Sequence, residues 1–101
     1  MTGSTFVNTT AEFYPTVVDL ATNSTTVTTR KAIIRSVYVN TTLSSHACLI
    51  KDGSTTVFTI PSGTVAGTWV PFGDTTFASG IVVDPDDSAT GNITVTWMLA
   101  T

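Results

Sequence analysis

The abundance of threonine constrains the fold of this chain more than any other feature of its sequence. Threonine occupies 23 of the 101 positions, whereas only 11% of the residues are charged. Its β-branched side chain is restricted at χ1 and suits the half-buried surface of a pleated sheet. No segment repeats apolar residues at helical spacing for more than a turn or two. The sequence therefore predicts an all-β protein.

The strand pattern predicts a single antiparallel β-sandwich. A chain of 101 residues corresponds to one domain. About seven or eight short strands are separated by turn residues at regular intervals, which is typical of a sandwich or barrel. Eight strands would permit a jelly roll. The clearest strand covers residues 92–100, where Ile93, Val95 and Trp97 alternate with polar residues and are expected to face the core.

An Asp-Gly pair at Asp52 and Gly53 predicts a β-hairpin. Type I′ turns need positive φ at both central residues, and Asp-Gly between two alternating runs meets that need. If these two residues form the loop, the flanking strands place Leu49, Phe58 and Ile60 on the same, core-facing side.

The first fifteen residues differ in character from the rest of the chain. They are small and polar, with isolated aromatic residues at Phe6, Phe13 and Tyr14. We expect an extended N-terminal arm at residues 1–15, followed by the sandwich domain at residues 16–101. Two interpretations of the arm remain open: its aromatic side chains dock on a partner, or the segment is an edge strand of its own domain.

An acidic segment, "DPDDSATG", precedes the last strand. Asp84, Asp86 and Asp87 carry the oxygen ligands that Ca²⁺ prefers. The spacing does not fit an EF-hand, because no Glu closes the loop and Gly91 comes late. A surface loop of small residues also gives no burial that would separate the pKa values of a catalytic acid and base. The sequence therefore predicts a solvated hairpin turn, with no metal site and no catalytic residues.

His46 and Cys48 are the only histidine and cysteine, and together they supply two of the four ligands that a structural zinc site needs. A Cys–His nucleophile pair also needs a third, orienting group and an oxyanion hole. We therefore expect no cofactor and no enzymatic activity. A single cysteine also excludes an intrachain disulfide.

Trp69 is the tryptophan that the alternation of apolar and polar residues does not assign to the core. It lies in the segment "GTWVPF", where Pro71 indicates an edge strand or a bulge. Tryptophan is enriched among the residues that dominate binding energy at interfaces. We expect Trp69 to be exposed, for a protein partner or for a sugar ring.

Charge and hydropathy exclude two classes of partner. The formal net charge is −3, and three of the four basic residues, Arg30, Lys31 and Arg35, lie in one short segment. That is too thin a basic stripe for nucleic-acid binding. No apolar run approaches the length of a membrane span. The first residues show no basic and apolar leader pattern, so we expect synthesis in a cytoplasm.

Residues from about 32 to 100 resemble a known group of proteins. The segment "VYVN", the Asp-Gly hairpin, "GIVV", a polar loop and "GNITVTW" follow one another in this order. Together they are similar to small β-sandwich accessory proteins of tailed bacteriophages. These include capsid decoration (cement) proteins and related head-fibre and tail-associated domains.

The resemblance implies a non-enzymatic structural role in a virion. A protein of this kind would bind the major capsid protein on the outer surface of a phage head, often as a homotrimer. Its contact residues would come from the arm, namely Phe6, Phe13 and Tyr14, and Trp69 adds an exposed aromatic side chain. Two alternatives stay open: a tail, neck or fibre domain that recognises the host, and a small carbohydrate-binding module.

A physical argument also favours self-association. A small sandwich has edge strands whose unpaired backbone groups need cover, and charged residues usually protect such edges. This chain has few charged residues. We therefore expect a homo-oligomer, with a trimer as the first expectation.

Overall fold

The computed structural model describes residues 13–100, which form eight β-strands and no helix. All the strand pairs are antiparallel. The all-β prediction is therefore confirmed. The strands are β1 (Tyr14–Asp19), β2 (Thr25–Thr28), β3 (Ala32–Val39), β4 (Cys48–Asp52), β5 (Thr55–Ile60), β6 (Trp69–Phe77), β7 (Ile81–Pro85) and β8 (Asn92–Leu99).

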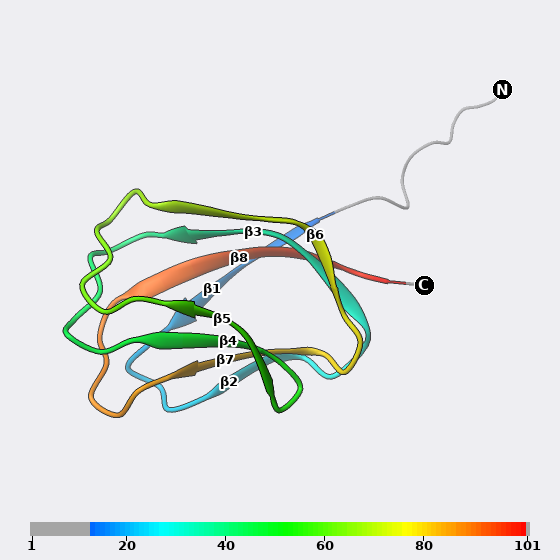
Figure 1. Cartoon of the computed structure of the whole chain (residues 1–101). Coiled ribbons are helices and arrows are strands. Elements are labelled where there is room, and N and C mark those ends of the chain that lie inside the picture. Colours follow the sequence, from blue (N-terminus) through cyan, green and yellow to red (C-terminus); the bar gives the residue numbers. More distant parts are fainter. Residues whose placement is uncertain (1–12, 101) are drawn as a thin grey trace, which may run out of the picture.

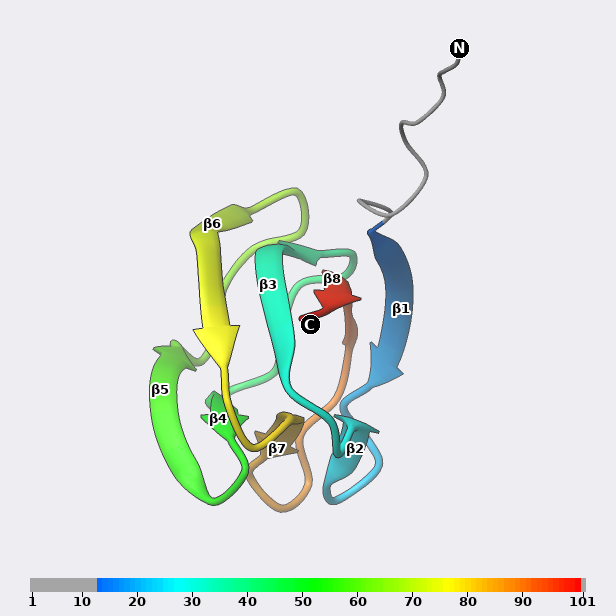
Figure 2. The same ribbon diagram turned by 90° about the vertical axis from the view of Figure 1, so that its right-hand side faces the viewer.

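The strands form two four-stranded sheets packed face to face. Sheet A has the order β1-β8-β3-β6, and sheet B has the order β2-β7-β4-β5. Figure 2 shows the two sheets as separate layers. The first strand pairs with the last, the second with the seventh, the third with the sixth and the fourth with the fifth. This nested pairing is the jelly-roll topology of an antiparallel sandwich.

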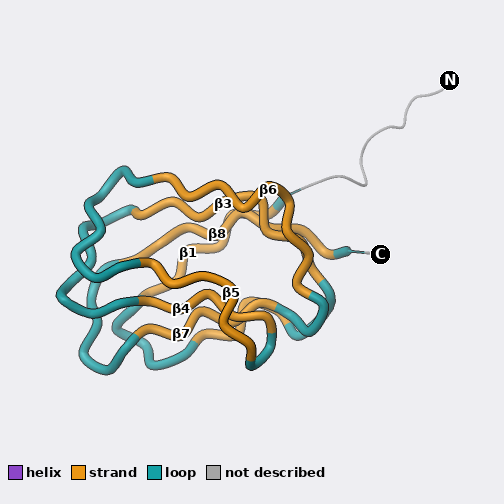
Figure 3. The backbone as a smooth tube through the Cα atoms, in the orientation of Figure 1, coloured by secondary structure: helices purple, strands orange, loops and turns teal. Residues whose placement is uncertain are grey.

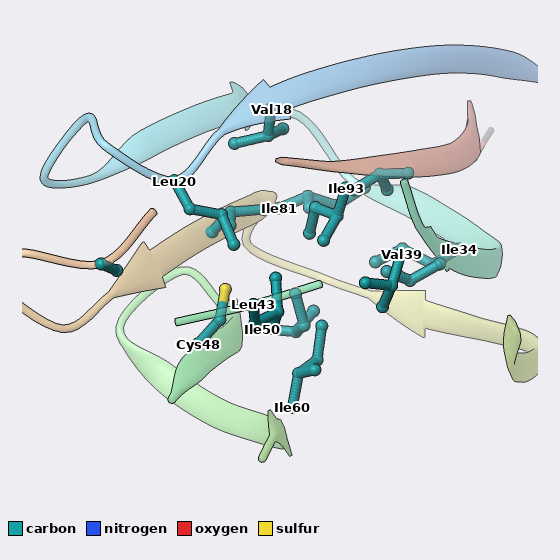
Figure 4. Close-up of a cluster of buried hydrophobic side chains, with 14 of the residues drawn as sticks. Val18, Leu20, Ile34, Val39, Leu43, Cys48, Ile50, Ile60, Ile81 and Ile93 are labelled. Atoms are coloured by element: carbon teal, nitrogen blue, oxygen red, sulfur yellow. The ribbon is translucent and has the colours of Figure 1, made fainter. Parts of the chain in front are cut away.

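The core lies between the two sheets and is almost entirely aliphatic. Figure 4 shows side chains from both sheets meeting there, including Ile34 and Ile93 of sheet A and Ile50 and Ile81 of sheet B. Phe77 is the largest fully buried side chain. Each such aliphatic or aromatic side chain stabilises the fold by roughly 1.5–3 kcal/mol relative to exposure.

The sandwich has two distinct ends. Tyr14 is paired with Trp97, so β1 begins where β8 approaches its end. We call this the arm end; the short turns at 29–31, 53–54 and 78–80 also lie here. The longer connections gather at the opposite end, which we call the loop end (Figures 1 and 3). They are residues 20–24, 40–47, 61–68 and 86–91.

The predicted arm, residues 1–15, overlaps the first strand of the structure. β1 begins at Tyr14, so Tyr14 and Pro15 pair with β8 as part of an edge strand. Tyr14 and Pro15 therefore belong to an edge strand of the domain, which was the second interpretation of the arm. Phe6 and the rest of residues 1–12 lie outside the described residues.

The predicted hairpin forms between β4 and β5, but its loop is shifted by one residue. Asp52 pairs with Thr55, and the loop residues are Gly53 and Ser54. The carboxylate of Asp52 accepts hydrogen bonds from the backbone N–H groups of Ala78 at 3.2 Å and Ser79 at 2.7 Å. Asp52 therefore serves as a link to the neighbouring β6–β7 turn rather than as a loop residue.

The sequence-based prediction assigned the wrong side of β4 to the core. A bulge at Val57 of β5 lets Ile50 pair with Phe58, so Ile50 points into the core and Leu49 points outward. Ile60 is fully buried as predicted, whereas Phe58 lies at the open edge and is 39% exposed. A bulge adds one residue to one strand, which reverses the facing of everything beyond it.

Candidate functional site

Among the described residues, Phe58 is an exposed aromatic residue of sheet B, and the exposed aromatic residues of sheet A lie at two different places. The first surrounds the start of β1. Tyr14 is 50% exposed, and its ring centroid lies 5.7 Å from that of Trp97. The indole N–H of Trp97 donates a hydrogen bond to Thr16 Oγ1 at 2.9 Å, and the ring packs against the core. Tyr14 is therefore held against the domain by one side of its ring, while the other side faces solvent.

Tyr14 and Trp97 lie on the core-facing side of sheet A, in register with Val18 and Ile93, whereas Phe13 contacts the exposed side chain of Arg35. The guanidinium carbon of Arg35 lies 3.8 Å from the centre of the Phe13 ring, which is a cation–π contact. Arg35 Nε also lies 3.2 Å from Asp74 Oδ1, although both side chains are more than half exposed. Solvent screens such a pair, so it orients Arg35 more than it stabilises the fold. We call Phe13, Tyr14, Arg35 and Trp97 the arm-end cluster.

The second group forms a row across the outer face of sheet A. Trp69 in β6 pairs with Tyr38 in β3, Tyr38 pairs with Thr94 in β8, and Thr94 pairs with Val17 in β1. The exposed fractions are 59% for Trp69, 44% for Tyr38 and 65% for Val17. We call these four residues the distal patch, because they lie toward the loop end, away from Tyr14.

Phe13 and Tyr14 are neighbours in the chain, but they contact different residues, Arg35 and Trp97 respectively, and Trp69 lies apart from both. Sequence reasoning missed Tyr38, Val17 and Arg35. A signal existed for Tyr38, because it lies between Val37 and Val39, and two buried valines force the residue between them outward. No comparable signal marks Arg35, whose position depends on a bulge in β3.

The acidic segment is not the turn of a hairpin. β7 belongs to sheet B and β8 to sheet A, so residues 86–91 cross between the sheets. Asp84 is paired with Lys51, with Nζ 3.2 Å from Oδ2. Asp86 is anchored through its backbone, which donates to Ala47 O at 3.1 Å. Within residues 13–100, no three His, Cys, Asp or Glu side chains are grouped closely enough to hold a metal ion.

Cys48 is a buried core residue rather than a reactive thiol. Burial, together with the negative charges of Asp84 and Asp86, raises its pKa to about 12. A thiol with this pKa stays protonated at neutral pH and is a poor nucleophile. His46 lies in the β3–β4 connection and not on β4, so the two residues do not share a strand face.

Residues 13–100 contain no helix that could cross a membrane. Comparison with known proteins adds no identification. No family model matches the chain, and neither a curated protein nor a solved structure matches it.

Proposed function

We propose that this chain is a non-enzymatic virion protein, a decoration (cement) protein that binds the major capsid protein on the outside of a phage head and stabilises it. The observation that carries this proposal is the arm-end cluster. It exposes Tyr14 and holds the half-buried Phe13 against Arg35, on a domain with few charged residues. Aromatic residues and arginine are enriched at protein interfaces, and aromatic anchors often dominate their binding energy.

The fold is compatible with this role without specifying it. Jelly rolls occur in viral capsid proteins and in lectins, and a fold of this kind hosts unrelated functions. Support for a virion therefore comes from the sequence resemblance described above. The protein would be made in the host cytoplasm and would end on the capsid surface.

Self-association is part of the proposal, with a trimer as the first expectation, and β5 is the edge that supports it. The other edges carry features that discourage pairing: Pro15 in β1, Pro71 in β6 and a length of only four residues in β2. β5 has the sequence "TTVFTI", with a bulge at Val57 but no charged residue and no proline. An edge of this composition pairs readily with another strand.

The amount of the protein in purified virions tests the proposal directly. A decoration protein should be present at a copy number of the same order as that of the major capsid protein. A few copies per particle would instead favour a tail, neck or fibre domain. Absence from virions would contradict both assignments.

Binding of variants to purified capsids tests the arm-end cluster. We expect Tyr14→Ala and Phe13→Ala to weaken binding at least about tenfold, whereas Tyr14→Phe keeps the ring and most of the affinity. Thr26→Ala, on the exposed outer face of sheet B, is the control and should bind normally. Equal binding of Tyr14→Ala and Thr26→Ala would exclude the arm-end cluster as the contact.

A further inference from the structure

The distal patch presents two flat aromatic side chains side by side. Trp69 and Tyr38 are directly opposite residues on β6 and β3, and both are exposed. Opposite residues on adjacent strands have Cβ atoms roughly 4.5–5.5 Å apart. A sugar ring has a face of C–H groups of similar width, and such a face packs on an aromatic ring whose polar tip stays hydrated. The pair therefore has the shape of a platform for sugar rings.

Fixed amide groups border this platform on the side of the loop end. Asn40 Nδ2 donates to Asn92 Oδ1 and to Thr94 Oγ1, each at 2.8 Å. Both hydrogens of the Asn40 amide are therefore used, which holds its side chain in one orientation. Its carbonyl oxygen and the Asn92 amide nitrogen have no hydrogen-bond partner among residues 13–100. The border thus offers an acceptor and a donor beside the rings.

These amides favour a hydroxylated ligand over an apolar one. A purely apolar partner placed on Trp69 and Tyr38 would also cover Asn40 and Asn92 and leave polar groups unsatisfied. A buried polar group without a partner is costly, whereas a sugar hydroxyl can both accept and donate.

The two central rows of this face carry no charge, and in the next row toward the loop end the exposed carboxylate of Asp19 lies opposite Asn92, so a neutral ligand is favoured and an anionic one is disfavoured. Two rows of facing residues cross all four strands of sheet A there. They are Val17, Thr94, Tyr38 and Trp69, and then Pro15, Thr96, Ser36 and Pro71. We infer that the distal patch binds a neutral polysaccharide, with sugar rings stacked on Trp69 and Tyr38 and hydroxyls bonded to Asn40 and Asn92. This inference does not depend on the capsid role, because it uses a different surface.

The test uses the purified full chain and three neutral probes: hydroxyethyl cellulose, mannan and galactan. Hyaluronan serves as the anionic comparison. We expect at least one neutral probe to retard the protein in affinity electrophoresis and to change its tryptophan fluorescence. Trp69→Ala should weaken binding about tenfold or more and remove the fluorescence change, since Trp97 lies against Tyr14 and the core.

Three further variants separate stacking from general effects on the fold. Trp69→Phe keeps a flat ring and should retain most of the affinity. Asn40→Ala should weaken binding to the neutral probe. The fluorescence change of Trp69 should remain, because the sugar ring can still stack on it. Thr26→Ala, on the outer face of sheet B, should bind as the unaltered chain does. Equal thermal midpoints of the variants would show that each one is folded.

Several results would overturn the inference. They are the absence of binding to all three neutral probes, equal affinities of the unaltered chain and Trp69→Ala, and tighter binding of hyaluronan. Concentration-dependent self-association that Trp69→Ala abolishes would also overturn it and would assign the patch to a second copy of the chain. Because no capsid is present, failure here leaves the capsid-binding test unaffected.

Discussion

Gly80 is the position where the backbone leaves the least room for a side chain. Its φ is +103°, and a Cβ atom there would lie 2.3 Å from the backbone oxygen of Thr28 and 2.9 Å from Thr29 Cα. Both neighbours are backbone, so neither can swing aside. The turn between β6 and β7 is therefore packed directly against the chain that leaves β2.

We expect Gly80→Ala to lower the free energy of unfolding by about 2–5 kcal/mol, because overpacking adds to the cost of positive φ. Gly63→Ala is the matched control, since Gly63 has a φ of +72° but nothing within 4 Å of the added atom. It should lose about 1–2 kcal/mol, the conformational cost alone. Urea unfolding measures both. Losses that agree within about 0.5 kcal/mol would show that the turn relaxes around the new methyl group.

Cys48 should make stability fall in alkali. Its pKa is raised from 9.0 to about 12 in the folded chain. Between these two values the unfolded chain loses the thiol proton while the folded chain keeps it. Stability is therefore complete below pH 9 and declines as the pH rises toward 12, by up to about 1.4 kcal/mol per pH unit.

The variant Cys48→Ala isolates this contribution. Every other titratable group is the same in the two proteins. Urea unfolding at several pH values from 8 to 11 should give a steeper decline for the unaltered chain than for Cys48→Ala. Parallel curves would mean that the thiol ionises in the folded protein as easily as in the unfolded one.

Among the strands, periodicity predicted the facing of β8 and failed for β4. In β8 the alternation runs without interruption, and Ile93 and Val95 are fully buried as predicted. In β4 the facing depends on its partner, where the bulge at Val57 shifts the register. Composition does not mark a bulge without glycine, so Leu49 could not be assigned outward from the sequence.

The free edge of β5 gives a prediction about assembly. Thr59 pairs with Leu49 on the outward side, so a lysine there would place a charge along the edge without entering the core. Thr59→Lys should raise the dissociation constant for self-association at least about tenfold, since an edge charge disfavours strand pairing. Sedimentation over a range of concentrations measures the change.

Thr26→Lys provides the matched control for this experiment. Thr26 is exposed on β2, the other edge of sheet B, and receives the same charge. It should leave self-association unchanged. If Thr26→Lys disrupted assembly and Thr59→Lys did not, β2 rather than β5 would be the pairing edge. A monomer at every concentration would contradict self-association altogether.

The β-sandwich could be predicted from the sequence, whereas its jelly-roll pairing and the candidate site could be predicted only in part. Strand number and turn residues predict a sandwich, but they do not say which strands pair. For that reason residues 86–91 resembled a hairpin turn, although they connect two sheets. The same limit applies to the surfaces. Trp69 could be predicted as exposed, whereas its partner Tyr38 is 31 positions earlier (69 − 38) and becomes its neighbour only through the β3–β6 pairing.

The nested pairing also determines how the chain must fold. Among the described strands, β1 pairs only with β8. Its hydrogen bonds can therefore form only when the two ends of the chain have come together. Closing such long loops costs entropy before any contact compensates for it. Two-state folding in about milliseconds to seconds is therefore expected, the range of β-proteins dominated by non-local pairs.

The variant Trp69→Phe leaves Trp97 as the single fluorescent reporter of β1–β8 docking, because Trp97 contacts Tyr14 and Thr16 of β1. Its stopped-flow signal should follow the same slow, single-exponential course as the circular dichroism of the sheets. A Trp97 signal complete in microseconds would contradict this expectation. It would mean that the two ends of the chain meet before the strands between them are ordered.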